Sequence, residues 1–371
     1  MAPFTYTSRP GRVVFGAGAL QHLGREIELL GARRALVLST PEQADTAQRI
    51  AVLLGERAAG IYAQAKMHVP IETARAARAE ARRLGADCAV AIGGGSTVGL
   101  GKAIALDASG DAGFPILAIP TTYAGSEMTP IYGLTESGVK KTGRDPRVLP
   151  RTVIYDPELT LTLPLVMTVT SAMNAIAHAA EGLYAPDANP IVALMAEEGI
   201  RACAAALPRL AADPRDLDAR GDALYGAWLC GTVLGQISMG LHHKLCHTLG
   251  GTFDLPHAEV HTVVLPHALA YNAAHAPEAM RRIARALGVS ERAAASRDRH
   301  DARASSAPAA IFDLARDHGA PTALRDIGMP ADGLDRAADL AVQNEYPNPR
   351  PLERGAIREL LQRAYDGTRP D

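Results

Sequence analysis

Cysteine is scarce in this sequence. Four cysteines occur among its 371 residues, and no two of them form a CxxC pair. They are Cys88, Cys203, Cys230 and Cys246, and all lie in largely apolar stretches. Extracellular domains that depend on disulfides are much richer in cysteine, whereas cytosolic thiols stay reduced. The pattern predicts reduced thiols and a cytoplasmic protein.

Long apolar runs and a strong charge imbalance are also missing. The N-terminal stretch MAPFTYTSRPGRVVFG has no apolar run of the kind a signal peptide needs, and no segment approaches the length of a membrane span. The net charge is −2 and aromatic residues make up 4% of the chain, which argues against a basic surface or a stacking platform for nucleic acid. We therefore expect a soluble protein that binds neither membranes nor nucleic acid.

The first half of the sequence alternates short β-rich runs with helical patterns. Strands are predicted at residues 12–15, 35–39, near 61, 88–92 and 115–119, and helices at 19–30, 42–54, 72–84 and 97–106. This alternation is typical of a mainly parallel sheet with helices on both faces. Helical patterns alone follow after about residue 160, at 172–183, 191–207, 219–239 and from 277 onward. We predict an α/β domain at residues 1–160 and an all-α domain at 161–371, with residues 291–310 as an exposed excursion.

Two loops that follow predicted strands have the composition of a nucleotide site. Gly93-Gly94-Gly95-Ser96 leads from a strand into a helix, where glycines permit close approach of a ligand and free N–H groups favour an anion such as a pyrophosphate. The segment PTTYAGSE (120–127) follows the next buried strand, and ligands of open α/β sheets bind beyond the carboxyl ends of strands. Its hydroxyl groups suit contacts to a ribose or a phosphate.

Common signatures do not match these loops. A Walker loop would need glycine in place of Ser96 and a hydroxyl residue in place of Ala103. A hydrolase nucleophile elbow at Ser96 would need glycine in place of Val98. The earlier Gly16-Ala17-Gly18 lacks the third glycine of a dinucleotide fingerprint, since Gln21 stands there. The loops therefore predict an anion site that belongs to none of these classes.

Histidine is concentrated in one stretch, GLHHKLCHTLGGTFDLPHAEVHTVVLPH (240–267), which holds six of the 12 histidines. His243 and His247 are four apart and so share one face of a helix. Gly250-Gly251 is predicted to end that helix, and Pro256-His257 to lie in a loop that folds back toward the same face. Grouped imidazoles indicate a proton donor, an anion site or a metal site, and the residues alone leave these three open.

Several segments together resemble the iron-containing alcohol dehydrogenase superfamily, whose architecture is dehydroquinate synthase-like. They are GGGS after a strand, PTTYAGSE, SAMNAIAHAAEGLY (171–184), HHKLCHTLGG and LPHAEVHTVVLPH (255–267). Within the superfamily, FTYTSRPGRVVFGAGAL near the N-terminus, SAMNAIAHAAEGLYAPDANP and the tail YPNPRP resemble the maleylacetate reductases. The resemblance extends in order from about residue 10 to Pro351.

The resemblance implies an N-terminal NAD(P)-binding domain, a helical catalytic domain and an active site in the cleft between them. NADH or NADPH would be the reductant, with its pyrophosphate on the glycine turn. The residues implied in cofactor binding are Ser39, Gly94, Gly95, Ser96, Thr121, Thr122, Ser126 and Lys141. An acidic residue after the second strand would repel the 2′-phosphate of NADPH, but Ser39-Thr40 stands there, so both cofactors should be tolerated.

The resemblance also exposes a departure from the family's metal site. Metal-dependent relatives hold iron or zinc with an Asp and a His four apart on one helix and with two later histidines. The matching residues here are Asn174, His178, His243 and His257. An amide oxygen is a much poorer ligand than a carboxylate for a divalent ion, so no metal is expected, although three neutral imidazoles can still bind zinc.

The activity implied is NAD(P)H-dependent reduction of the C=C bond of maleylacetate, giving 3-oxoadipate, in the catabolism of aromatic compounds. Hydride adds to the alkene carbon β to the ketone, and the enolate that forms needs hydrogen-bond donors rather than a Lewis acid. We predict His178, His243 and His257 as donors around this small dianionic keto acid. His247 is predicted on the nicotinamide side or as a proton relay, and a homodimer is expected.

Other functions remain open at this point. A metal-dependent alcohol dehydrogenase acting on a small alcohol or aldehyde would use the same histidines. A sugar-phosphate cyclase of the same architecture would need intact zinc ligands, which Asn174 interrupts. A metallohydrolase with an HExxH helix would need glutamate where Lys244 stands.

Overall fold

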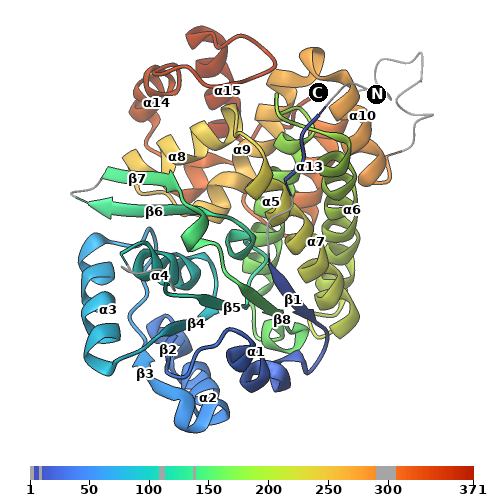
Figure 1. Cartoon of the computed structure of the whole chain (residues 1–371). Helices are drawn as coiled ribbons and strands as arrows, with labels where there is room; N and C mark the ends of the chain where they lie inside the picture. Colours follow the sequence, from blue (N-terminus) through green and yellow to red (C-terminus); the bar gives the residue numbers. More distant parts are fainter. Residues whose placement is uncertain (1–3, 8–10, 108–112, 137–138, 290–305) are drawn as a thin grey trace. The chain divides into compact units, whose positions relative to one another are not determined.

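The computed structural model of this chain describes residues 4–7, 11–107, 113–136, 139–289 and 306–371. The polypeptide divides into two compact units, Thr7–Leu163 and Pro164–Asp371, and residues 4–6 group with the second. The described strands all belong to the first unit, and the second is helical (Figure 1). The predicted fold class, α/β followed by all-α, is therefore confirmed. Within the described residues, no helix combines the length and apolar character needed to cross a membrane.

The first unit is built on a six-stranded sheet in the order β1-β8-β5-β4-β2-β3, with all neighbours parallel. The strands are β1 (Arg12–Phe15), β2 (Ala35–Leu38), β3 (Ala58–Tyr62), β4 (Cys88–Gly93), β5 (Ile116–Pro120) and β8 (Thr152–Tyr155). The helices are α1 (Leu23–Leu29), α2 (Ala44–Leu54), α3 (Ile71–Leu84) and α4 (Gly95–Leu106). Strands β2, β4 and β5 are buried along their whole length, as parallel strands covered on both faces must be.

Helices cover both faces of this sheet, as the sequence predicted. Val37 of β2 packs with Ile27 of α1 and Ile50 of α2 in one apolar cluster. Its neighbour Leu36 belongs to a second cluster with Ala77 of α3. Successive side chains of a strand point to opposite faces, so the two clusters are the two cores on either side of the sheet.

Three strands were missed by the sequence-based prediction. Strands β6 (Ile131–Glu136) and β7 (Val139–Arg144) form an antiparallel hairpin outside the main sheet, and β8 lies between β1 and β5. Strand β6 carries no alternation of buried and exposed positions, since all of its residues are half-buried. Strand β8 has only four residues and gains its burial from its two neighbours, which periodicity does not reveal.

The second unit consists of helices packed around an apolar core. They are α5 (Leu165–Gly182), α6 (Pro190–Ala212), α7 (Leu217–Gln236), α8 (Leu241–Phe253), α9 (His257–Asn272), α10 (Pro277–Ala286), α13 (Ala307–Asp317), α14 (Leu334–Ala341) and α15 (Arg354–Asp366). One core cluster joins α8, α9, α14 and α15 through residues such as Leu245, Val264, Leu334 and Leu361. This packing holds α8 and α9, which carry most of the grouped histidines, on a rigid frame.

Two predictions about the histidine stretch were wrong. Gly250-Gly251 does not end the helix, because α8 continues to Phe253 and the left-handed residue is Asp254, with a φ of 54°. Asp tolerates this conformation, and Gly250 is buried inside the helix, so tertiary packing outweighs the low helix propensity of glycine. His257 does not lie in a loop either, since Pro256 is the N-cap residue and His257 begins α9.

The predicted excursion at residues 291–310 is only partly open to comparison. Residues 291–305 lie outside the described part of the chain. The prediction was wrong for 306–310, where Ser306 caps α13 by accepting a hydrogen bond from the backbone N–H of Ala309, which is fully buried. The composition of this alanine-rich run suggested an exposed segment. Small side chains also allow close packing between helices, which is why residues here are buried.

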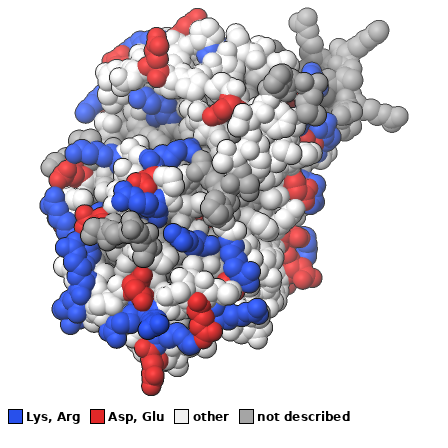
Figure 2. Space-filling view, viewed as in Figure 1, with Lys and Arg blue, Asp and Glu red and all other residues white. Residues whose placement is uncertain are grey.

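On the face seen in Figure 2, many charged side chains gather along the left edge and in the lower half, and several acidic side chains there lie next to basic ones. Helix α3, which is rich in arginine, illustrates this pairing. Arg83 contacts Glu80 within the helix at 2.7 Å, and Arg82 contacts Asp107 at 2.8 Å. These exposed pairs contribute little to stability, but they leave few unpaired charges on this helix.

His267 in the middle of α9 predicts a pH-dependent stability. Its ring is 3% exposed and packs edge-on against Phe312 of α13, and burial, aided by the charge of Arg363, lowers its pKa to about 4. The unfolded chain binds this proton first, so stability is complete above about pH 6.5 and is lost as the pH falls toward 4. Relative to His267→Leu, the wild-type free energy of unfolding in urea should fall by about 2 kcal/mol from pH 7 to pH 5. A difference between the two proteins that does not change with pH would contradict this account.

Candidate active site

Three helices of the second unit bring the predicted histidines together. His178 comes from α5, His243 and His247 from α8, and His257 from the start of α9. The ring centroids of His178 and His243 are 5.2 Å apart, and those of His243 and His247 are 6.1 Å apart. The ring of His261, one turn after His257, is 4.9 Å from His243 and 4.4 Å from His257. The four predicted catalytic histidines therefore form one cluster, connected through His261.

The histidines of the cluster differ in solvent exposure. His178 and His243 are each 4% exposed, His257 is half-buried and His247 is exposed. Burial, reinforced by the charges of the neighbouring histidines, lowers the pKa of His178 well below its usual value. His178 is therefore neutral at neutral pH, and its ring offers one N–H donor and one acceptor. His257 and His247 are the members of the cluster that reach the solvent.

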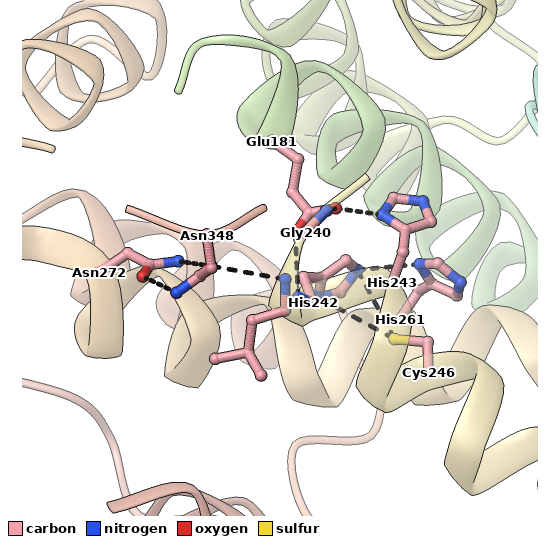
Figure 3. Close-up of polar contacts among 9 residues, drawn as sticks. Glu181, Gly240, His242, His243, Cys246, His261, Asn272 and Asn348 are labelled. Carbon is pink, nitrogen blue, oxygen red and sulfur yellow. Dashed lines mark hydrogen bonds and ion pairs between the residues drawn. The ribbon is translucent and has the colours of Figure 1, made fainter. Parts of the chain in front are cut away.

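A buried carboxylate, which the sequence analysis did not select, contacts this cluster. Glu181 lies one helical turn after His178 on α5 and is fully buried. Its Oε2 atom is 2.5 Å from Nδ1 of His243 (Figure 3). The same side chain accepts hydrogen bonds from the backbone N–H groups of Gly240 at 3.2 Å and His242 at 2.9 Å. One sequence signal was available, because Glu181 is the only charged residue in the apolar helix segment SAMNAIAHAAEG and follows His178 at helical spacing.

A second set of buried polar side chains, His242, Cys246 and His261, adjoins this cluster. Nε2 of His242 is 2.9 Å from Nδ1 of His261, and the thiol of Cys246 is 3.6 Å from Nε2 of His242 (Figure 3). Burial lowers the pKa values of both imidazoles and raises that of the Cys246 thiol, so all three groups are neutral near pH 7. These three side chains contact one another, and the rings of His242 and His261 also pack against that of His243.

In the first unit, the two predicted cofactor loops lie side by side. Gly93 of β4 pairs with Pro120 of β5 in the parallel register, so the turn that follows β4 meets the loop that follows β5. Gly94 is the N-cap residue of α4, which begins at Gly95 rather than at Thr97 as predicted. The free N–H groups of a helix N-terminus thus lie at the carboxyl edge of the sheet, where an anion is stabilised.

Two glycines of this turn, Gly93 and Gly94, stand where a side chain would be strained or crowded. A Cβ on Gly94 would lie 3.0 Å from Oγ1 of Thr122, and the φ of Gly93 is +145°. Thr121 accepts a hydrogen bond from the amide of Gln43 at 3.0 Å, so its hydroxyl is held at the same edge. Ser39 is fully buried and donates to the carbonyl of Thr40, so its hydroxyl is already engaged. The structure thus brings Gly94, Gly95, Ser96, Thr121 and Thr122 together.

The lysine implied by the resemblance lies elsewhere. Lys141 is on β7, where its side chain is 70% exposed and pairs with Glu136 at 3.1 Å. Lys102 of α4 is fully buried instead, and its Nζ donates to the carbonyl oxygens of Ser126 and Ile131 at 2.7 Å each. Burial lowers the pKa of Lys102 to about 7. Lys102 thereby anchors the loop that carries Ser126, a role that sequence motifs did not reveal.

Family models match both units of the chain. The model described as iron-containing alcohol dehydrogenase matches residues 10–157, and the C-terminal model of the Fe-containing alcohol dehydrogenase family matches residues 168–365. The chain belongs to the iron-containing alcohol dehydrogenase family. The resemblance noted in the sequence is therefore confirmed at the level of the family, for both units.

Within the iron-containing alcohol dehydrogenase family, several similar relatives are named maleylacetate reductase. A maleylacetate reductase of Burkholderia cepacia is 68% identical over 370 residues, which cover 100% of both chains. One from Sphingobium indicum is 57% identical and covers 99% of both. The crystal structure of maleylacetate reductase from Agrobacterium tumefaciens superposes with a TM-score of 0.91 at 52% identity and covers 100% of both chains.

The family's metal can be tested against the residues present here. Asn174 Oδ1, His178 Nδ1 and His243 Nε2 are buried and have no hydrogen-bond partner in the part of the chain that the structure describes. Among the described residues, the only histidine, cysteine or carboxylate set with three ligand atoms within 4.8 Å of one another is His242, Cys246 and His261. The ligand atoms of His178, His243 and His257 do not converge in this way, and Asn174 supplies an amide instead of a carboxylate. As they lie, these residues do not fit a divalent ion, and their unpartnered atoms are available to a polar substrate.

Proposed function

We propose that this protein is an NAD(P)H-dependent oxidoreductase that reduces the C=C bond of maleylacetate to give 3-oxoadipate. The observation that carries the proposal is the 68% identity, over the whole length of both chains, with a maleylacetate reductase. Other relatives that bear the same name are 52–57% identical over nearly the whole chain. Family membership supports use of a nicotinamide cofactor.

The cofactor is proposed to bind at the carboxyl edge of the sheet in the first unit. Its pyrophosphate would lie on Gly94, Gly95 and Ser96 at the start of α4, where helix N–H groups stabilise an anion. Thr121, Thr122 and Ser126 would contact the ribose and nicotinamide end, and Lys141 would have to leave Glu136 to take part. Since Ser39-Thr40 follows β2 with no carboxylate, both NADH and NADPH should serve.

The histidine cluster of the second unit is proposed to hold the dianionic keto acid. Hydride adds to the alkene carbon β to the ketone, and negative charge moves onto the ketone oxygen as an enolate. Hydrogen bonds from His178, His243 and His257 would stabilise that oxygen and orient the carboxylates. His243 would donate from Nε2 while its Nδ1 contacts Glu181, so both of its ring nitrogens would carry hydrogen. The unpartnered Nδ1 of His178 and Nε2 of His243 support this role because buried polar atoms require partners.

Protonation of the carbon next to the ketone completes the reaction. The group that delivers this proton must be able to recover it from solvent. His247 is exposed and its ring is 6.1 Å from that of His243, so we propose it as the relay. The half-buried His257 would then serve mainly as a donor.

The reaction is proposed to need no metal, since an enolate can be stabilised by hydrogen bonds alone. The test is NADH oxidation with maleylacetate, using protein stripped by a strong chelator and checked for residual metal. Full activity without metal is the expected result. Activity that vanishes and returns with zinc or iron would overturn the metal-free mechanism but keep the reductase. No activity in either state would overturn the function, and small alcohols and aldehydes would be the next substrates.

The setting proposed for this activity is cytoplasmic catabolism of aromatic compounds by a homodimer. The four cysteines are unpaired and buried, as reduced thiols in a cytoplasm would be. Light scattering after size-exclusion chromatography should give twice the chain mass of 39.0 kDa. A mass equal to one chain would contradict the dimer.

A further inference from the structure

We propose that Glu181 is the positioning residue of the site: its carboxylate fixes the ring of His243 so that Nδ1 carries a proton and Nε2 faces the substrate. The effect expected on kcat rests on the proposed function. The structural content of the proposal, the protonation and orientation of one ring, can be measured without any substrate.

The contact between the two side chains defines the ring's orientation. Oε2 of Glu181 is 2.5 Å from Nδ1 of His243, and both side chains are almost fully buried. Both carboxylate oxygens already accept backbone N–H groups, Oε2 from Gly240 and Oε1 from His242. A group that accepts on both oxygens is matched to a donor, so Nδ1 of His243 must bear hydrogen. Nε2 is then the atom left without a partner among the described residues.

The same carboxylate fixes the backbone that carries the ring. Gly240 is the N-cap residue of α8 and has no side chain to cap the helix. Glu181 reaches across from α5 and takes the N–H groups of Gly240 and His242, while Oδ1 of Asn348 accepts from the N–H of Leu241 at 3.4 Å. Figure 3 shows these contacts converging on the first turn of α8. His243 follows directly, so its main chain and its ring are held by one group.

The chain segments approach each other closely at this point, so a side chain at position 240 would crowd both of them. A Cβ on Gly240 would lie 3.1 Å from Oε1 of Glu181 and 3.1 Å from the carbonyl oxygen of Pro347. Asn348 is itself fixed by a reciprocal amide pair with Asn272, at 3.0 and 2.8 Å. Two residues from distant segments, Glu181 and Asn348, therefore hold the start of α8 in place. Of the two, Glu181 also contacts the ring of His243.

The variant Glu181→Gln tests whether Glu181 acts by positioning the ring of His243 or only by capping α8. The single oxygen of the glutamine cannot accept from all three donors, and its NH₂ group either faces a backbone N–H or donates to Nδ1 of His243. In the second arrangement Nδ1 of His243 accepts a hydrogen bond instead of donating one, so the contact that fixes its hydrogen in the wild type is lost. The matched control is Asn348→Ala, which removes one acceptor from the same helix turn but leaves the contact between Glu181 and His243 intact.

The kinetic experiment compares Glu181→Gln, Asn348→Ala, His243→Ala and the double variant Glu181→Gln/His243→Ala. If Glu181 acts through His243, Glu181→Gln should lower kcat by about 100-fold with an unchanged Kd for NADH. The double variant should be no slower than His243→Ala, because the two changes remove one function. Asn348→Ala should keep kcat within a few-fold of wild type. Additive losses, or equal losses from Glu181→Gln and Asn348→Ala, would overturn the proposal in favour of a capping role.

The spectroscopic experiment uses protein labelled with ¹⁵N at histidine, with the His243 signals assigned by their loss in His243→Ala. A protonated Nδ1 in the wild type, altered in Glu181→Gln but not in Asn348→Ala, is the expected result. An unprotonated Nδ1 in the wild type would overturn the proposal. If the protein proves inactive on maleylacetate, the proposed function fails, yet this measurement still decides the role of Glu181.

Discussion

His243→Ala is expected to lower kcat for maleylacetate reduction by about 100- to 10,000-fold while the protein still binds NADH. His243 lies between His178 and His261, is held by Glu181, and presents an unpartnered buried Nε2. Its loss removes a donor from the proposed enolate site. The proposed cofactor residues lie in the other unit, so quenching of protein fluorescence by NADH should give a nearly unchanged Kd.

The matched control for this change is His275→Ala. His275 is exposed in the short helix after α9, away from the clustered rings, and its replacement should leave kcat within about two-fold of wild type. Near-normal turnover by His243→Ala would remove His243 from the catalytic assignment. Loss of both turnover and NADH binding would instead indicate that the substitution disturbs the whole fold.

Gly93→Ala is expected to weaken NADH binding by about ten-fold or more and to lower the free energy of unfolding by about 1–3 kcal/mol. Gly93 has a φ of +145°, which an alanine rarely adopts. Its new Cβ would lie 2.6 Å from Oγ1 of Thr97 and 2.7 Å from Oε1 of Gln43. Gln43 in turn holds Thr121, so relief of the clash must shift both cofactor loops. Fluorescence titration and urea unfolding measure the two effects.

Gly24→Ala provides the control in the same unit. Gly24 lies within α1, and an added Cβ would meet only Nη1 of Arg57, at 3.9 Å. Alanine favours the helix, so this variant should be as stable as wild type or slightly more so, with unchanged NADH affinity. If Gly93→Ala bound NADH as tightly as Gly24→Ala, the turn after β4 would not be the pyrophosphate site.

The motifs whose parts are close in sequence were predictable. The strand, glycine turn and helix around Gly93–Ser96 are consecutive, so local composition was enough to predict this turn at the edge of a parallel sheet, where we propose the anion site. The spacing of His243 and His247 likewise follows from helix geometry. These features need only backbone periodicity, and the structure has them as predicted apart from shifted helix ends.

The contacts between distant segments could not be predicted in the same way. Glu181 and His243 are 62 residues apart, and the selection of Glu181 depends on how α5 packs against the start of α8. Lys102 was not selected from the sequence, yet its buried side chain anchors Ser126 and Ile131. Lys141 was preferred by resemblance, although β7 leaves it exposed and paired with Glu136.

By itself, then, the sequence determined the order of α/β and helical units, the glycine turn after β4 and the set of histidines, because each depends on local spacing and composition. The tertiary structure alone decided which buried groups meet: Glu181 with His243, His242 with His261, and Lys102 with the loop after β5. The physical reason is that a buried polar atom must find a partner wherever packing places one, and packing depends on the whole chain.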